Sequence, residues 1–218
     1  MRPRCARAQR IAVLVASRYP QVTFAISLAG PIVGMIEDRL YAQMNGLRDR
    51  GTTDEVVAAI TPLWEKSFRA WASGDPRAHD AVHRDIAEWR KKYPRSILPA
   101  TKQEMEMQGA SEFERVLSTW RSLPNDYLSE LARFRKKWLA IFGAIDRVVP
   151  TDASARNIVR YMALSGNKDY AVAVIPRCGH TPVDVETKRR IRFENLALNW
   201  IDDNVVALDN HAHREGSG

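Results

Sequence analysis

The chain has 218 residues, of which 45% are hydrophobic and 27% are charged, a composition typical of a globular protein with a sizeable core. The formal net charge of +7 suits nucleic-acid binding. The basic residues nevertheless lie beside acidic ones along helical segments, so no nucleic-acid partner is predicted. Cys5 and Cys178 are the only cysteines, which excludes a disulfide framework and a paired-cysteine metal site and favours a reducing, cytoplasmic compartment.

The N-terminal segment combines basic residues with a short apolar run over residues 11–16. A bilayer span needs about 20 apolar residues, and a secretory signal also needs a longer run than this one. We therefore interpret the segment as an amphipathic helix and predict no membrane partner. This helix is expected to end near Arg18, because Tyr19 precedes a proline and disfavours helical geometry.

An apolar run over residues 22–28 follows the first helix. Large apolar side chains alternate there with small ones rather than with charged ones, which predicts a strand covered on both faces. Gly30 and Pro31 mark the exit from this strand. A helix, a tight loop and a buried strand in this order indicate an α/β fold.

Residues 32–133 show long helical patterns, with breaks expected at Gly51, Gly74 and Pro94. Thr53 is predicted to cap one helix and Pro76 to open another. Four of the six tryptophans lie in this region, and we interpret them as packing between helices, with an apolar substrate wall as the alternative. They are Trp64, Trp71, Trp89 and Trp120.

The strand pattern returns after residue 134, with strands expected near residues 137–142 and 169–175. The helix between them is predicted to begin with Thr151 or Asp152 as its cap and to stop at Gly166. A final amphipathic helix is expected within residues 186–206 and a disordered tail over 208–218. Asp152 is interpreted as a cap rather than a second acid, and Cys178 as a small packing residue.

One polar residue follows each of these two strands: Asp146 in the loop after the first, and His180 in the loop after the second. Open α/β sheets bind ligands at the C-terminal ends of their strands. An acid beside a histidine can orient the imidazole and stabilise its protonated form. We therefore predict an Asp146–His180 pair, with ordinary turn or cap roles as the alternative for each residue.

The sequence around the pair resembles that of the α/β-hydrolase superfamily, in particular its dienelactone-hydrolase-like and serine-peptidase-like members. "WLAIFGAIDRVVP" resembles the strand-G-x-x-D-x-x-V-P segment of that family, and "GNKDYAVAVIPRCGHTP" resembles its strand-P-x-x-x-H segment. "IAVLVASRYPQVTFAISLAGP" resembles the helix and strand that follow the nucleophile elbow. The resemblance covers roughly residues 8–31 and 134–203, the C-terminal portion of the family fold.

The resemblance implies a partial α/β-hydrolase: a doubly wound sheet with a helical cap insertion. Residues 1–31 and 134–207 would form the core, and residues 32–133 the cap. The implied activity is serine-dependent hydrolysis of an ester, thioester or peptide-like acyl bond in a small-molecule substrate. No metal or organic cofactor is implied, and Asp146 and His180 would be the catalytic acid and histidine.

The family's nucleophile elbow, G-x-S-x-G, falls on residues 4–8, where Ala6 takes the place of the serine and both glycines are missing. Cys5 is a weak substitute without the elbow, and Ser17 and Ser27 lie on the following helix and strand. We therefore expect a truncated hydrolase that is inactive as given. The alternatives are a non-catalytic helical interaction module, a degenerate hydrolase, or a basic nucleic-acid binder.

Overall fold

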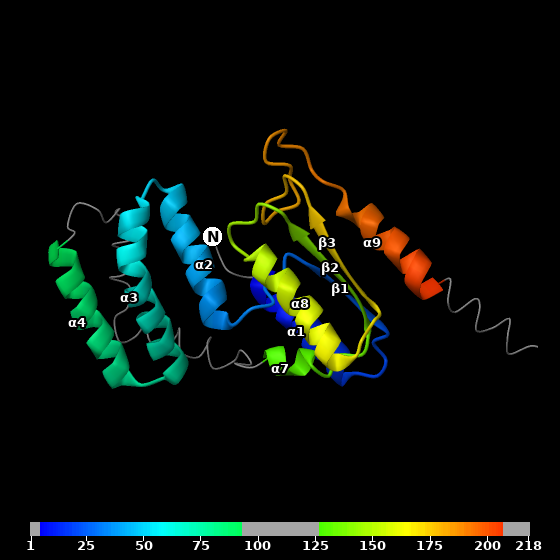
Figure 1. Ribbon diagram of the computed structural model, residues 1–218, viewed down its shortest axis with the longest axis horizontal. Coiled ribbons are helices and arrows are strands. Elements are labelled where there is room, and N and C mark those ends of the chain that lie inside the picture. Colours follow the sequence, from blue (N-terminus) through cyan, green and yellow to red (C-terminus); the bar gives the residue numbers. More distant parts are fainter. Residues whose placement is uncertain (1–4, 93–126, 207–218) are drawn as a thin grey trace, which may run out of the picture. The chain divides into compact units, whose positions relative to one another are not determined.

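A computed structural model describes residues 5–92 and 127–206 (Figure 1). In chain order its elements are α1 (Cys5–Arg18), β1 (Phe24–Leu28), α2 (Met35–Asp49), α3 (Asp54–Ser73), α4 (Pro76–Lys92), α7 (Tyr127–Leu131), β2 (Lys137–Gly143), α8 (Thr151–Ser165), β3 (Tyr170–Ile175), α9 (Phe193–Ile201) and the π-helix η1 (Asp202–Val206). Pro94, Trp120 and the predicted tail over 208–218 lie outside the described residues.

The chain divides into two compact units, one formed by residues 1–33 with 126–218 and the other by residues 34–125. The first unit contains the strands, and the second contains α2, α3 and α4. The interpretation of these parts as a hydrolase core and a cap insertion, with boundaries at 31 and 134, stays a prediction.

The three strands form a parallel sheet in the order β1-β2-β3. Ile26 of β1 lies opposite Leu139 of β2, and Leu139 lies opposite Ala171 of β3. The central strand β2 is buried along nearly all of its length. The predicted strands and the α/β fold class are confirmed.

The core of the first unit lies on one face of the sheet, where α1, α7 and α8 pack. Its buried residues include Val13, Leu14, Leu131, Phe134, Trp138, Ala140, Phe142, Ile158 and Met162. Trp138 also donates a hydrogen bond from Nε1 to the Ser27 hydroxyl at 3.0 Å. The opposite face meets α9, where Trp200 lies 6.2 Å from Phe24, measured between ring centroids. Helices thus lie on both faces, as in a doubly wound sheet.

The outer strands are less buried than the sequence predicts. Ala25 and Ser27 of β1 are buried, whereas Phe24, Ile26 and Leu28 on the α9 face are only partly covered. Side chains of β3 are partly or fully exposed, and α9 contains no buried residue. The prediction of a strand covered on both faces is therefore wrong for β1, and β3 is also less buried than β2, because β2 alone has a strand on each side.

The helical unit follows its predicted start and stop signals. The Thr53 hydroxyl accepts a hydrogen bond from the Val56 N–H at 3.5 Å and caps α3, and Gly74 ends α3 with a left-handed φ of 67°. Pro76 is the first residue of α4, where its missing N–H has no cost. The buried residues of α2, α3 and α4 form a second core, which includes Leu47, Val57, Ile60, Trp64, Phe68, Val82 and Ile86.

Two predicted helix starts differ from the structure. Thr151 and Asp152 are the first residues of α8 itself, after Pro150, and neither caps it. The Thr151 hydroxyl instead donates to the Gly143 carbonyl oxygen at 2.8 Å. The last helix begins only at Phe193, because the Asp184 carboxylate accepts backbone N–H groups two and three residues later and holds the chain in a turn.

None of the helices in the described part of the chain combines the length and the apolar character of a membrane span.

Candidate acid–histidine site

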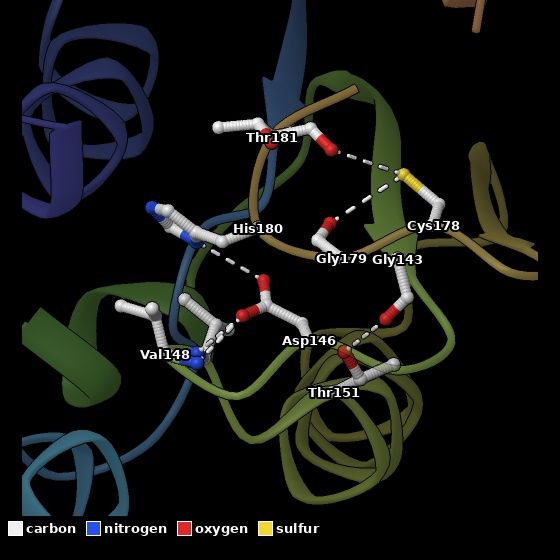
Figure 2. A network of polar contacts seen from close by, with 9 residues as sticks. Gly143, Asp146, Val148, Thr151, Cys178, Gly179, His180 and Thr181 are labelled. Carbon is white, nitrogen blue, oxygen red and sulfur yellow. Dashed lines mark hydrogen bonds and ion pairs between the residues drawn. The ribbon is translucent and has the colours of Figure 1, made fainter. Parts of the chain in front are cut away.

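The parallel pairing of β2 and β3 brings the two predicted site residues together (Figure 2). Asp146 follows the C-terminal end of β2, and His180 follows that of β3. His180 Nδ1 lies 3.1 Å from Asp146 Oδ2, although the residues are 34 positions apart in the sequence. Their role in catalysis stays a prediction, but their geometry is that of a hydrogen-bonded acid–histidine pair.

The Asp146 side chain is completely buried. Its Oδ1 accepts hydrogen bonds from the backbone N–H groups of Val148 at 2.7 Å and Val149 at 2.9 Å. These hydrogen-bond donors stabilise a carboxylate that is buried away from solvent. They also turn Oδ2 towards the imidazole.

His180 is oriented by this carboxylate, and 21% of its side chain is exposed. A carboxylate only accepts hydrogen bonds, so the proton of the pair belongs on Nδ1. The neutral imidazole then carries its lone pair on Nε2, which Figure 2 shows on the side of the ring away from Asp146. An imidazole held in this tautomer can take a proton from a nucleophile.

Gly143, the last residue of β2, lies where the acid and histidine loops meet. Its carbonyl oxygen accepts from the Asp146 N–H at 3.3 Å and from the Thr151 hydroxyl at 2.8 Å. The next backbone groups reach the histidine loop: the Ile145 N–H donates to the Cys178 carbonyl oxygen at 3.1 Å. Hydrogen bonds thus tie both loops to the end of β2.

A second carboxylate, Asp184, shapes the histidine loop. Its Oδ1 accepts from the N–H groups of Glu186 and Thr187, both at 2.9 Å, and its Oδ2 lies 3.1 Å from the Arg177 guanidinium. The Thr187 N–H, followed by the Glu186 N–H and the Arg177 charge, lowers the pKa of Asp184. Sequence reasoning missed this residue. The signal that could have revealed it is an aspartate followed by polar residues in a predicted turn.

Cys178 lies in the same loop and is buried. Burial raises the pKa of its thiol, and the negative charges of Asp146 and Asp184 raise it further. The Sγ atom lies 3.4 Å from the Gly179 carbonyl oxygen and 3.5 Å from that of Thr181. A neutral, buried thiol is a poor nucleophile, which agrees with its interpretation as a packing residue.

The candidate nucleophile positions lie on α1 and β1. Cys5 and Ala6 are the first two residues of this helix. The Ser17 hydroxyl donates to the Leu14 carbonyl oxygen at 2.9 Å, and the Ser27 hydroxyl accepts from Trp138. Both serines therefore have structural hydrogen bonds, and the assignment of the nucleophile position to Ala6 rests on the sequence resemblance.

The helical unit has a groove of its own, with a volume of about 890 Å³. Residues of α2 and α3 line it, among them Leu40, Tyr41, Met44, Arg48, Glu65 and Arg69. Its lining therefore mixes apolar and charged side chains. Trp64, one of the tryptophans for which a substrate wall was the alternative, belongs to the helical core instead.

Fold and site together define an α/β protein with a parallel sheet and an acid–histidine pair at its C-terminal edge. The chain is similar in structure to an alpha/beta hydrolase enzyme from a Medee basin deep-sea metagenome library, with 16% identity and a TM-score of 0.42. The match covers 89% of this chain and 62% of that one.

It is also similar to a protein described as a candidate non-heme bromoperoxidase from Mycobacterium tuberculosis H37Rv, with 15% identity and a TM-score of 0.35. That match covers 79% of this chain and 56% of the other. The chain thus spans less than two thirds of either protein. No family model matches the sequence, and no curated protein matches it either.

Proposed function

We propose that this chain carries the acid and the histidine of a serine-hydrolase active site. The observation that supports the proposal is the 3.1 Å contact between His180 Nδ1 and the buried Asp146 carboxylate at the C-terminal edge of the sheet. The order of acid before histidine along the chain is that of α/β-hydrolase triads. The substrate would be a small molecule with an ester, thioester or peptide-like acyl bond.

In the proposed reaction, a serine hydroxyl gives its proton to His180 Nε2 as its oxygen attacks the acyl carbon. Asp146 remains ionised and stabilises the imidazolium that forms. His180 then passes the proton to the leaving group, and an acyl-serine remains. Water then attacks the acyl-serine while His180 takes its proton, and the carboxylic acid is released as the proton passes to the serine oxygen.

We further propose that the chain by itself does not catalyse this reaction, because Ala6 takes the position of the serine and its methyl group cannot attack a carbonyl. The test is to measure turnover of p-nitrophenyl acetate by the wild-type chain and by His180→Ala. We expect the two rates to be equal. Turnover by the wild-type chain that His180→Ala abolishes would contradict the proposed inactivity.

The proposed roles can be tested by supplying the missing hydroxyl. We expect Ala6→Ser to react with a fluorophosphonate probe at the introduced hydroxyl, as located by peptide mass spectrometry. Adding His180→Ala to this variant should remove the labelling, because no base would activate the hydroxyl. The wild-type chain is the control for reaction at other residues.

A second candidate function is a non-catalytic helical interaction module, and the groove on α2 and α3 is the feature that favours it. The same experiment separates the two candidates. An Ala6→Ser chain that keeps the Asp146–His180 hydrogen bond and still does not react would contradict the nucleophile position and favour the module.

A further inference from the structure

We propose that Gly143 is the positioning residue of the acid–histidine pair: its missing side chain admits the histidine loop, and its carbonyl oxygen anchors the acid loop. This proposal rests on the proposed function for its meaning in catalysis. Its structural content concerns only the geometry of His180 and Asp146. It can therefore be tested in a chain that has no activity.

The histidine loop approaches the backbone of Gly143 more closely than any other residue type would allow. A Cβ atom at Gly143 would lie 2.8 Å from the Cys178 carbonyl carbon and closer still to the carbonyl oxygens of Cys178 and Gly179. These are backbone atoms, so no side-chain rotation relieves the overlap. An alanine at this position would push away the peptide units that directly precede His180.

The acid loop is held from the same residue. The Gly143 carbonyl oxygen accepts from the Asp146 N–H and from the Thr151 hydroxyl, which is buried. Figure 2 shows Gly143 between Thr151 on one side and the Cys178–Gly179 backbone on the other. A shift of this residue therefore changes the position of the acid and that of the histidine relative to each other.

The chain offers a matched control in Gly179, which lies in the histidine loop itself. A Cβ atom there would meet only the Val185 Cγ1 atom, at an ordinary 3.7 Å. Gly179→Ala therefore adds the same methyl group one residue from His180 without displacing backbone. A difference between Gly143→Ala and Gly179→Ala isolates the close approach from any general effect of an added methyl group.

The readout is the NMR signal of the His180 Nδ1 proton, assigned by its loss in His180→Gln. We expect Gly179→Ala to keep this signal unchanged. We expect Gly143→Ala to lose the downfield signal, because the hydrogen bond to Asp146 is broken. A Gly143→Ala chain with the signal of Gly179→Ala would overturn the proposal.

The role of the Gly143 carbonyl oxygen is tested by substituting Thr151, which leaves the histidine loop uncrowded. These variants also test the proposal if Gly143→Ala fails to fold. Thr151→Val removes the hydroxyl and nearly preserves the shape of the side chain, whereas Thr151→Ser keeps the hydroxyl. We expect faster exchange of the His180 Nδ1 proton with water in Thr151→Val and the wild-type rate in Thr151→Ser. Equal rates in the two variants would overturn the proposal.

In the Ala6→Ser background, Gly143→Ala should slow fluorophosphonate labelling by about 100-fold, the typical effect of a displacement of about 1 Å in a catalytic group. Gly179→Ala should label at the rate of Ala6→Ser alone. Failure of Ala6→Ser to react at all would count against the proposed function and would leave the NMR result for Gly143 unaffected.

Discussion

Asp146 and Asp184 use the same local hydrogen-bond pattern for different purposes. In each case Oδ1 accepts the backbone N–H groups two and three residues later, and Oδ2 is left to meet a nitrogen from elsewhere. For Asp146 this nitrogen belongs to His180, and for Asp184 it belongs to Arg177. The first pattern orients the candidate histidine, and the second holds the turn that follows it.

The lowered pKa of Asp184 makes its contribution to stability depend on pH. The Asp184 carboxylate binds a proton less readily in the folded chain than in the unfolded chain. Its contribution to stability is therefore fully present at pH values above the unfolded pKa of about 4. It is lost as the pH falls through the lower pKa of the folded chain. We expect Asp184→Asn to melt at a lower temperature than the wild type at pH 7.

The melting difference between Asp184→Asn and the wild type should shrink steadily below about pH 4. Thermal unfolding followed by circular dichroism across this range measures it. A difference that stayed constant from pH 7 to pH 3 would show that the charge of Asp184 does not contribute to stability.

At the scale of elements, α8 binds the loop that follows β1 and the loop that follows β2. Its first residue, Thr151, binds the end of β2. One turn further on, the Ser154 hydroxyl accepts from the Ile32 N–H at 3.0 Å. About a turn after Ser154, the Asn157 side chain donates to the Ile32 carbonyl oxygen at 2.7 Å. Helix α8 therefore fixes the exit of β1 and the exit of β2 from a single face.

Ser154→Ala should destabilise the first unit by about 1–3 kcal/mol, because the buried Ile32 N–H loses its acceptor. Urea unfolding measures the change. Ser17→Ala is the matched control, since the Ser17 hydroxyl only donates to the Leu14 carbonyl oxygen within α1. An equal cost for both substitutions would argue against a special role of the α8 contact.

Two glycines near the end of α2 should respond to alanine in opposite directions. Gly46 lies within the helix, and an added Cβ would meet only the Arg50 guanidinium, at 3.6 Å or more. Gly46→Ala should therefore stabilise the helical unit by about 0.5–1 kcal/mol. Gly51 has a φ of 84° with open space around it, so Gly51→Ala should destabilise the unit by about 1–2 kcal/mol through backbone strain alone.

Urea unfolding of these two variants beside the wild type compares the effects directly. A stabilising Gly51→Ala would contradict the left-handed conformation at this residue. A destabilising Gly46→Ala would contradict the ordinary contact distance between an added Cβ and the Arg50 guanidinium.

At the scale of the whole molecule, each of the two units has a hydrophobic core of its own. Ile158 is fully buried in the core beneath the sheet, and Ile60 is almost fully buried in the helical core. The candidate site draws its residues only from the first unit. The geometry of the acid–histidine pair therefore depends on the core of the first unit.

Ile60→Ala should cost about 2–5 kcal/mol in the helical unit, since it leaves a cavity in a packed core. Native-state hydrogen exchange should show lower protection in α3, with β2 and the His180 Nδ1 proton unchanged. Ile158→Ala should give the reverse pattern. Loss of protection in both units after either substitution would show that the two cores unfold together.

Much of the architecture could be predicted from local signals. Apolar runs located the three strands, and Pro20, Gly74 and Gly166 marked helix ends that the structure contains. The start of the last helix was misjudged because the Asp184 side chain competes with helical hydrogen bonding, which a hydrophobic period does not register. The role of Thr151 was missed because its acceptor, Gly143, lies at the end of the preceding strand.

The sequence by itself determined the succession of helices and strands and placed Asp146 and His180 after neighbouring parallel strands, because these features depend on periodicity and chain order. Only the tertiary structure decided that Asp146 Oδ2 meets His180 Nδ1 and that the histidine loop rests on Gly143. These contacts join segments 34 or more residues apart. They depend on the register of β2 with β3 and on the close approach of the histidine loop to the Gly143 backbone. Neither feature produces a periodic pattern in the sequence.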